Sequence, residues 1–425
     1  MRKAIAIAFA HWAFGSSLGA QTPQPLAPSP QSLAVYLITI GEGEYYWEKF
    51  GHNAIWFRDA ARGIDVAYNW GVFDFQEPGY LGRVLRNDLR YWVDAVPAPL
   101  FIDFYRRTDR TVVIQHLGLT PEQAQKVYDY AQWNAREENK YYRYDYFLDN
   151  CSTRVRDLID LALGGAFKSA TASQPGTGTY RSETLRLVDD MKVTQFAINA
   201  ALAQPADKQL TVWENMFVPS RVRDAIRGLR VPDSSGALVP VVAEERVVYE
   251  SQNHRERETT PSLALPYLII GLLLAAELFA IGWVGRRSGS ANKFFGFEVA
   301  LWALIVGILG VVLLLGWMIT KHAFWYHNEN LLVLNPLALF LVALAPMSLW
   351  RTRWSRPAAI CAVIIAMLSA LALVLKGLPW FHQDNVPMIL LLLPPHFAVA
   401  HGLWVRANPA LHPLSPSTRH LPPAS

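Results

Sequence analysis

The chain has 425 residues, of which 52% are hydrophobic and 17% are charged, and its formal net charge is +4 at pH 7. Globular proteins usually carry about 25% charged residues, so the deficit indicates a membrane-embedded part. The composition excludes a disordered chain, a collagen-like repeat and a disulfide-stapled miniprotein. The small charge gives no reason to expect a nucleic-acid partner.

Residues 1–20 (MRKAIAIAFAHWAFGSSLGA) are typical of a secretory signal peptide. Arg2 and Lys3 give a positive start, residues 4–14 form a short apolar core, and small residues complete the segment. We expect cleavage at its end; the alternative is an uncleaved anchor. Either way, the segment that follows is exported.

The first part of the exported segment contains a candidate base. The whole exported segment, 21–262, has three histidines: His52, His116 and His254. His52 opens the alternating run HNAIWF, which predicts a strand, and the run 65–75 (DVAYNWGVFDF) is expected to pair with it. Asn69 or Asp74 in that run would hold the imidazole by its second nitrogen, as the third member of a triad does. The other two histidines fit a strand end and a charged, solvated stretch.

A helix is predicted to run from Pro121 to about residue 139, with Thr120 as N-cap and Gln123 at the third position. The aromatic tract 141–147 (YYRYDYF) follows. It either lines an acyl groove or packs in the core beside the next helix.

Cys151 lies in the stretch DNCSTRVRDLIDLAL, whose apolar residues recur at helical spacing from Ser152 onward. With Asp149 or Asn150 as N-cap, the cysteine falls in the first turn, where free N–H groups and the helix dipole favour the nucleophilic thiolate. The only other cysteine, Cys361, lies in an apolar run and cannot pair with it. The alternative is a buried, inert thiol.

Two arginines flank this cysteine in the sequence, Arg143 and Arg154. They are candidates to bind a phosphate headgroup or an oxyanion, and the alternative is an ordinary ion pair. Further along, residues 169–180 are predicted to form a loop. The segment 213–222 (WENMFVPSRV) either packs on the domain or lies on the membrane.

Five apolar runs are long enough to cross a bilayer, which takes about 20 residues. They lie at 263–284, 295–319, 331–350, 357–376 and 386–405. Lys and Arg gather in the first and third loops and after the fifth run, which predicts that these parts are cytoplasmic. Residues 21–262 then lie outside and the tail 406–425 inside. Glu277, within the first run, is expected to face the bundle interior because a carboxylate is costly in lipid.

The second and fourth loops of this region resemble each other. WYHNENLL (325–332) and WFHQDNVP (380–387) share an aromatic pair, then histidine, amide, acid and asparagine. We expect a rim that binds a lipid headgroup or an acceptor amine, formed by His327, Glu329, Asn330, His382, Asp384 and Asn385. The alternative is interface anchoring by the aromatic residues. No close-spaced ligand motif supports a metal site.

The order of histidine, polar orienter and helix-borne cysteine resembles the circularly permuted NlpC-type papain fold. The strings YYWEKFGHNAIWF, YNWGVFDF, LGLTPEQ and YRYDYFLDNCSTRVRDLID, followed by five spans, resemble the Lnb family of bacterial lipoprotein N-acyltransferases. The resemblance implies an α+β permuted papain-like periplasmic domain (21–262), followed by an all-α five-helix transmembrane domain (263–405) in the inner membrane. It also implies that Cys151 and His52 are the catalytic pair.

The functional hypothesis is acyl transfer from a phospholipid, through a thioester at Cys151, to the N-terminal amine of a lipoprotein. No phosphate-cradling loop, dinucleotide fingerprint or HExxH motif is present, and this chemistry needs no cofactor. Two alternatives remain open: a membrane-tethered cysteine hydrolase acting on wall peptides or lipids, and a non-enzymatic sensor or scaffold with a structural cysteine. The oligomeric state is not predicted.

Overall fold

The computed structural model describes residues 33–408. They form two compact units. The first holds the described residues up to Gln195 together with Lys208–Thr260, and the second holds Phe196–Asp207 and the described residues from Pro261 onward. A short internal segment therefore belongs with the apolar helices, although the sequence boundary groups it with the exported domain.

Two sequence predictions fall largely beyond these limits. The signal peptide, 1–20, lies outside the described residues, and so does most of the predicted cytoplasmic tail, 406–425.

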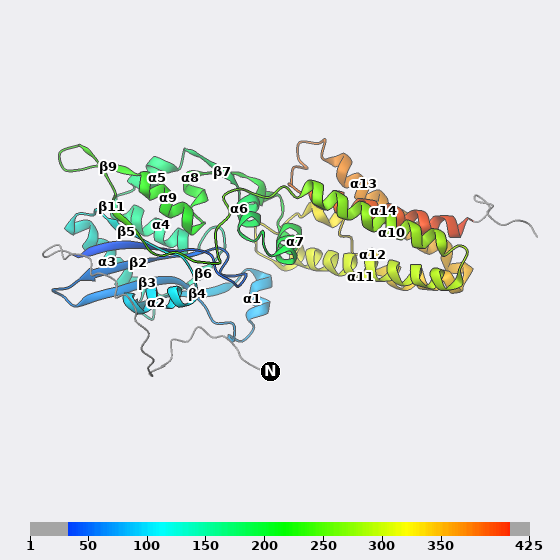
Figure 1. Ribbon diagram of the computed structural model, residues 1–425, viewed down its shortest axis with the longest axis horizontal. Helices are drawn as coiled ribbons and strands as arrows, with labels where there is room; N and C mark the ends of the chain where they lie inside the picture. The colour runs from blue at the N-terminus through cyan, green and yellow to red at the C-terminus, as the bar shows by residue number, and fades with distance from the viewer. Residues whose placement is uncertain (1–32, 409–425) are drawn as a thin grey trace, which may run out of the picture. The chain divides into compact units, whose positions relative to one another are not determined.

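The first unit is built on a seven-stranded antiparallel sheet (Figure 1). The strand order is β11-β5-β1-β2-β3-β4-β6. The strands are β1 (Ala34–Ile40), β2 (His52–Asp59), β3 (Ile64–Val72), β4 (Leu89–Pro97), β5 (Val112–Leu117), β6 (Tyr141–Tyr144) and β11 (Val242–Tyr249). The predicted strand at His52 and its pairing with the run after residue 64 are both confirmed: β2 and β3 are neighbours, with Ile55 opposite Tyr68.

Helices cover both faces of this sheet, because its strands alternate two sets of apolar side chains. One face, with Leu37 and Ile55, packs against α3 (Pro121–Asn134), α4 (Cys151–Ala162) and α9 (Pro219–Gly228). The other face, with Ile38 and Ala54, packs against α2 (Ala98–Arg107). The predicted Thr120 capping box of α3 is confirmed, and the helix ends five residues earlier than expected.

Shorter elements complete the unit. They are α1 (Tyr80–Arg86), α5 (Ala166–Thr171), β7 (Pro175–Thr179), α6 (Tyr180–Leu187), α7 (Lys192–Ala201, whose second half belongs to the other unit), β8 (Gln209–Thr211), α8 (Val212–Asn215), β9 (Arg230–Pro232) and β10 (Leu238–Pro240). The prediction of a loop over 169–180 is wrong, because this stretch holds the end of α5 and β7, which pairs with β8. The open question about 213–222 is answered by burial: Met216, Phe217 and Val222 lie in the interior of the first unit.

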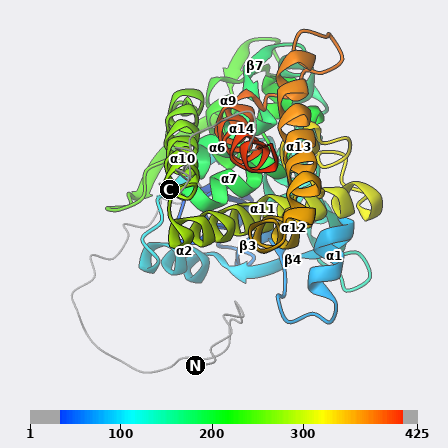
Figure 2. The ribbon, with the colours of Figure 1, turned by 90° about the vertical axis from the view of Figure 1, so that its right-hand side faces the viewer.

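The second unit is helical, and four of its helices are long and apolar enough to cross a membrane. Its elements are the 3-10 turns η1 (Gln204–Asp207), η2 (Glu329–Leu332) and η3 (Thr352–Trp354) and the helices α10 (Ala264–Val284), α11 (Gly289–Ile319), α12 (Ala338–Trp350), α13 (Ser355–Leu375) and α14 (Val386–Ala407). Viewed along the bundle, α14 lies between α10 and α13 (Figure 2) and packs against both, while α11 packs against α12.

Two expectations about these helices need correction. The predicted span 331–350 is helical only as α12, which has 13 residues and is short for a crossing. The reason lies before it: Pro336 disfavours helical geometry at Asn335, whose side chain instead accepts a hydrogen bond from the backbone of Leu337. Glu277 is exposed on the surface of α10 and does not face the bundle interior.

Candidate active site

Cys151 is the first residue of α4, and a network of side-chain bonds fixes the start of this helix. The buried N-cap Asn150 accepts hydrogen bonds through Oδ1 from the backbone N–H groups of Ser152 (2.8 Å) and Thr153 (2.9 Å). Its amide donates to the carbonyl oxygens of Tyr146 (2.7 Å) and Phe217 (2.9 Å). The predicted cap is confirmed, and it ties the cysteine to two other segments.

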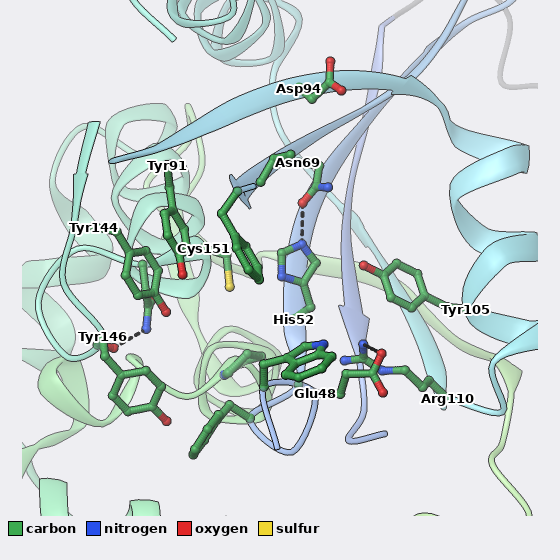
Figure 3. A pocket seen from close by; sticks show the side chains of 18 of the residues that line it. Glu48, His52, Asn69, Tyr91, Asp94, Tyr105, Arg110, Tyr144, Tyr146 and Cys151 are labelled. Atoms are coloured by element: carbon green, nitrogen blue, oxygen red, sulfur yellow. Dashed lines mark hydrogen bonds and ion pairs between the residues drawn. The ribbon is translucent and has the colours of Figure 1, made fainter. Parts of the chain in front are cut away.

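His52 and Asn69 come from adjacent strands and face each other. His52 Nε2 and Asn69 Oδ1 lie 2.5 Å apart. Because an amide oxygen can only accept, Nε2 carries the hydrogen and Nδ1 is the free basic nitrogen. Figure 3 shows that the ring's other nitrogen is turned toward the sulfur of Cys151. Asp74, the alternative orienter, instead accepts a hydrogen bond from the backbone of Gln76 (2.8 Å).

Gly71 lies beside both candidate catalytic residues, Cys151 and His52. It has φ +95°, beside an irregularity in the pairing of β3 with β4. A Cβ placed on it would lie 3.4 Å from Cβ of Cys151 and 3.8 Å from Cε1 of His52. Glycine is suited here because it adopts positive φ without strain and adds no atom between the two side chains.

Burial sets the charge state of the pair. Both residues keep some exposed area toward the pocket, but the surrounding protein removes most of the water from their titrating atoms. Burial lowers the pKa of His52 to about 4. It raises the pKa of Cys151 to about 11, against the opposing effects of the backbone N–H groups of Asn53 and Ser152 and of the positive charge on Arg110. The resting site is therefore a neutral thiol and a neutral imidazole. The N–H group of Ser152 at the helix start favours the thiolate, as expected, but desolvation outweighs this effect and keeps the thiol neutral.

The pocket around Cys151 has a volume of about 290 Å³ and is predominantly aromatic. Tyr91 stacks between Phe73 (ring centroids 4.8 Å apart) and Tyr144 (4.1 Å), which holds its ring beside the sulfur (Figure 3). The two interpretations of the tract 141–147 apply to different residues. Tyr144 and Tyr146 line the pocket, whereas Tyr142 belongs to the core.

Two protein-family models match the chain: the Lnb N-terminal periplasmic domain over residues 27–189 and the Lnb transmembrane domain over residues 258–402. The chain belongs to the Lnb family. Together the two matches cover well over half of its length, and the first contains His52, Asn69 and Cys151. No curated protein and no solved structure matches it.

Arg110 is a pocket residue that the sequence analysis missed. It is 5% exposed, and its Nε and Nη2 donate to the carbonyl oxygen of Gly41 at 3.0 and 2.9 Å. Its guanidinium also lies 3.7 Å from the carboxylate of Glu48 and over the ring of Tyr105. Nothing in the sequence around Arg110 signals this position, which arises because the turn before β5 packs beside the end of β1.

The two arginines chosen from the sequence do not line this pocket. Arg154 forms an ion pair with Asp149, at 2.5 and 2.7 Å, and lies over the ring of Tyr142, which is the ordinary ion pair given above as its alternative. Arg143 is exposed, donates to the carbonyl oxygen of Asn87 at 2.9 Å, and borders a separate polar hollow.

The six residues expected to form a functional rim all lie in the second unit, and half of them are tied into its interior. Asn330 and Asn385 are fully buried and bonded to each other (2.9 Å), and Asn330 also donates to the carbonyl oxygen of Ala200 (3.0 Å). Glu329 pairs with Lys376. These bonds favour a structural role for the three.

The other three rim residues are exposed: His327, His382 and Asp384. The side chain of His382 contacts Gln204. Across residues 33–408, no group of His, Cys, Asp and Glu side chains has the arrangement needed to hold a metal ion.

Proposed function

We propose that this chain is a membrane-bound acyltransferase that moves an acyl group from a phospholipid, through a thioester on Cys151, to the N-terminal amine of a lipoprotein. The observation that carries the proposal is the set of His52, Asn69 and Cys151 at an aromatic pocket. It supplies a nucleophile, a base and an orienting group. The order of these residues along β2, β3 and α4 supports the permuted papain-like fold.

The first half-reaction forms the thioester. As the sulfur of Cys151 attacks the ester carbonyl, its proton passes to Nδ1 of His52, and the negative charge moves to the carbonyl oxygen. The backbone N–H group of Cys151, which the Asn150 cap does not bind, is suited to stabilise that oxygen. When the ester C–O bond breaks, the leaving alkoxide takes the proton from His52 and departs as the alcohol of a lysophospholipid.

The second half-reaction forms the amide. A neutral α-amine attacks the thioester carbonyl, and His52 takes a proton from the attacking nitrogen. The C–S bond then breaks, and the sulfur recovers the proton from His52. Atoms and charges balance over the two steps without a cofactor, and the bond from Nε2 to Asn69 holds the ring in one orientation throughout.

The pocket suits an acyl substrate because much of its wall consists of aromatic rings, including Phe73, Tyr91 and Phe101. The second unit contains four long apolar helices that would anchor the chain in the bilayer, where both substrates reside. We further propose that 21–262 is periplasmic, that 263–405 spans the inner membrane and that 406–425 is cytoplasmic.

The test uses the full-length protein in lipid vesicles whose phospholipid carries a labelled acyl chain. Without acceptor, the wild type should acquire label that neutral hydroxylamine releases, and Cys151→Ala should acquire none. Adding a diacylglyceryl-modified peptide should move the label to its N-terminus as an amide.

Other outcomes contradict specific parts of the proposal. Release of free fatty acid without amide would support the cysteine hydrolase instead. Amide formed without label would refute a phospholipid donor, and an unlabelled wild-type protein that still makes labelled amide would refute the thioester.

A further inference from the structure

Five aromatic side chains surround one side of the pocket opening; we call them the aromatic fringe. They are Tyr45, Tyr46, Trp47, Phe75 and Tyr80. Their rings form a connected row across three segments: Tyr45 and Trp47 lie 5.0 Å apart between centroids, Trp47 and Phe75 lie 5.4 Å apart, and Phe75 and Tyr80 lie 5.4 Å apart. All but Tyr45 also line the pocket that contains Cys151.

The aromatic fringe is accessible to solvent. Tyr45 is 44% exposed, Tyr46 is 49% exposed and Phe75 is 38% exposed. Contiguous exposed rings are unfavourable in water and usually mark an interaction surface. Tyrosine and tryptophan together favour the boundary between lipid headgroups and acyl chains, because their rings are apolar and their edges carry a polar group.

Three exposed arginines border a polar hollow at the far end of α1 from the fringe. Helix α1 begins with Tyr80, in the fringe, and ends with Arg86, which borders a polar hollow together with Arg90 and Arg143. Arg90 stacks on the ring of Tyr141, with 4.1 Å between the guanidinium carbon and the ring centroid. None of the three forms an ion pair within the described part of the chain.

The same hollow also contains carboxylates, namely Asp88, Glu137 and Glu138. Glu137 is paired with Lys140 at 2.7 Å. The three arginines are exposed and form no ion pair among the described residues, and the hydrogen bonds of Arg86 and Arg143 use only their Nε atoms. The Nη atoms of their guanidinium groups remain available to bind phosphate oxygens.

We propose that the aromatic fringe, together with Arg86, Arg90 and Arg143, forms a face that lies on an anionic phospholipid bilayer. The rings enter the interface, the guanidinium groups bind lipid phosphates, and the opening of the Cys151 pocket faces the acyl-chain region. The role in donor entry rests on the proposed acyl transfer, whereas the docking itself does not.

The geometry gives a physical reason for this arrangement. A phospholipid ester lies at the headgroup boundary, and an acyl chain that crossed water to reach Cys151 would lose favourable apolar contact. A row of rings that is continuous from the outer surface to the pocket wall removes that crossing. α1 joins the two parts of the face, since it carries a fringe residue at one end and an arginine at the other.

The test measures the depth of single labelled sites in the full-length chain in lipid nanodiscs. The background carries Cys151→Ala and Cys361→Ser, so that no acyl chemistry takes place and a single cysteine is added each time. Tyr46→Cys and Phe75→Cys probe the fringe. Leu238→Cys is the matched control, because Leu238 is 62% exposed and lies in the β9–β10 hairpin, at the opposite end of the same unit from α1 (Figure 1). Each site carries an environment-sensitive fluorophore, and the quencher is a phospholipid with a spin label on its acyl chain.

Quenching several-fold stronger at positions 46 and 75 than at 238 is expected. It should decline in discs without anionic lipid and in the triple variant Arg86→Gln, Arg90→Gln, Arg143→Gln. Equal quenching at all three positions would overturn the docking face. Strong quenching at position 46 that is unchanged without anionic lipid and in the triple variant would overturn the role of the arginines. Because the background is catalytically dead, neither result depends on whether the chain transfers acyl groups.

Discussion

His52 bonds to Asn69 through Nε2, which leaves Nδ1 as the ring nitrogen able to accept the proton of Cys151. The two strands that carry His52 and Asn69 are adjacent, so the orientation of the ring is a property of the sheet. Loss of His52 should therefore remove the base, whereas loss of Asn69 should leave the imidazole ring in place but free to rotate.

The first prediction concerns Cys151 and His52 as a unit. Cys151→Ala and His52→Ala should each lower acyl transfer by at least about a thousandfold, and the double variant should be no worse, because members of such a set act together. Cys151→Ser should be nearly inactive, since a hydroxyl is far harder to ionise than a thiol. Amide formation in membranes with matched protein levels is the measurement. Full activity in Cys151→Ala would end the thiol mechanism.

Asn69→Ala should lower activity less than Cys151→Ala or His52→Ala does. The base remains, but its ring loses the bond that fixes the tautomer, so we expect a loss of about 10-fold to 100-fold in the rate of thioester formation. Single-turnover labelling of Cys151 checks this. Asp74→Ala is the control, because Asp74 bonds only to a local backbone group in the turn after β3. Equal losses in the two variants would contradict the orienting role.

The acid limb of thioester formation should lie near pH 4. His52 acts as a base in its neutral form, and burial lowers its pKa from the usual 6.5 to about 4; the rate should therefore hold as pH falls from 7 to about 5 and decline below that. Amide formation should decline earlier, because an α-amine acceptor has a pKa of about 8 and is protonated below it. Rapid-quench labelling with and without acceptor separates the two limbs. A thioester limb centred near pH 6.5 would show that the ring is solvated.

Gly71→Ala should lower both stability and activity. The positive φ costs a non-glycine residue about 1–2 kcal/mol, and the new Cβ would contact Cys151 and His52. Gly63→Ala is a matched control, because Gly63 also has positive φ, at +65°, but a Cβ there meets no atom within 4 Å. The temperature of thermal unfolding should fall in both variants, whereas the rate of acyl transfer should fall chiefly in Gly71→Ala. Equal activity in the two would remove Gly71 from the site.

Asn330→Ala and Asn385→Ala should destabilise the helical unit. Each leaves a fully buried amide without its partner, which costs about 1–3 kcal/mol. Asp384→Ala, at an exposed position in the same loop, should change the unfolding temperature little. The measurement is the unfolding temperature of the full-length chain in detergent, detected by its aggregation on heating. Wild-type stability with reduced transfer in Asn330→Ala would instead restore the substrate-binding interpretation of these loops.

The local parts of the fold and site could be predicted from the sequence, because their signals are local. The strand at His52, the capped start of α4 at Cys151 and the capping box at Thr120 each follow from a few neighbouring residues. The residue that orients His52 could be narrowed to two candidates, Asn69 and Asp74, since both lie in a run predicted to pair with the strand at His52.

What could not be predicted depends on tertiary packing. The charge state of Cys151 is decided by desolvation, which no local pattern reports, and Arg110 reaches the pocket only because the turn before β5 packs against the end of β1. The two polar loops share a sequence pattern, from which we expected a substrate-binding rim. The pattern did not reveal that Asn330 and Asn385, which occupy the same place in the two loops, bond to each other in the interior.

The segment Phe196–Asp207 has a practical consequence for isolating the unit that contains Cys151. The chain leaves the first unit at Gln195, returns at Lys208 and leaves again after Thr260, so a single cut cannot separate the two. A protein ending at Thr260 would keep this segment but lose the side chains that bind its carbonyl oxygens, among them Asn328 on Ala200 and Ala201. The segment would then be a flexible insertion with unsatisfied backbone groups, which favours aggregation. A soluble version is better made by replacing Phe196–Asp207 with a short polar linker than by truncation alone.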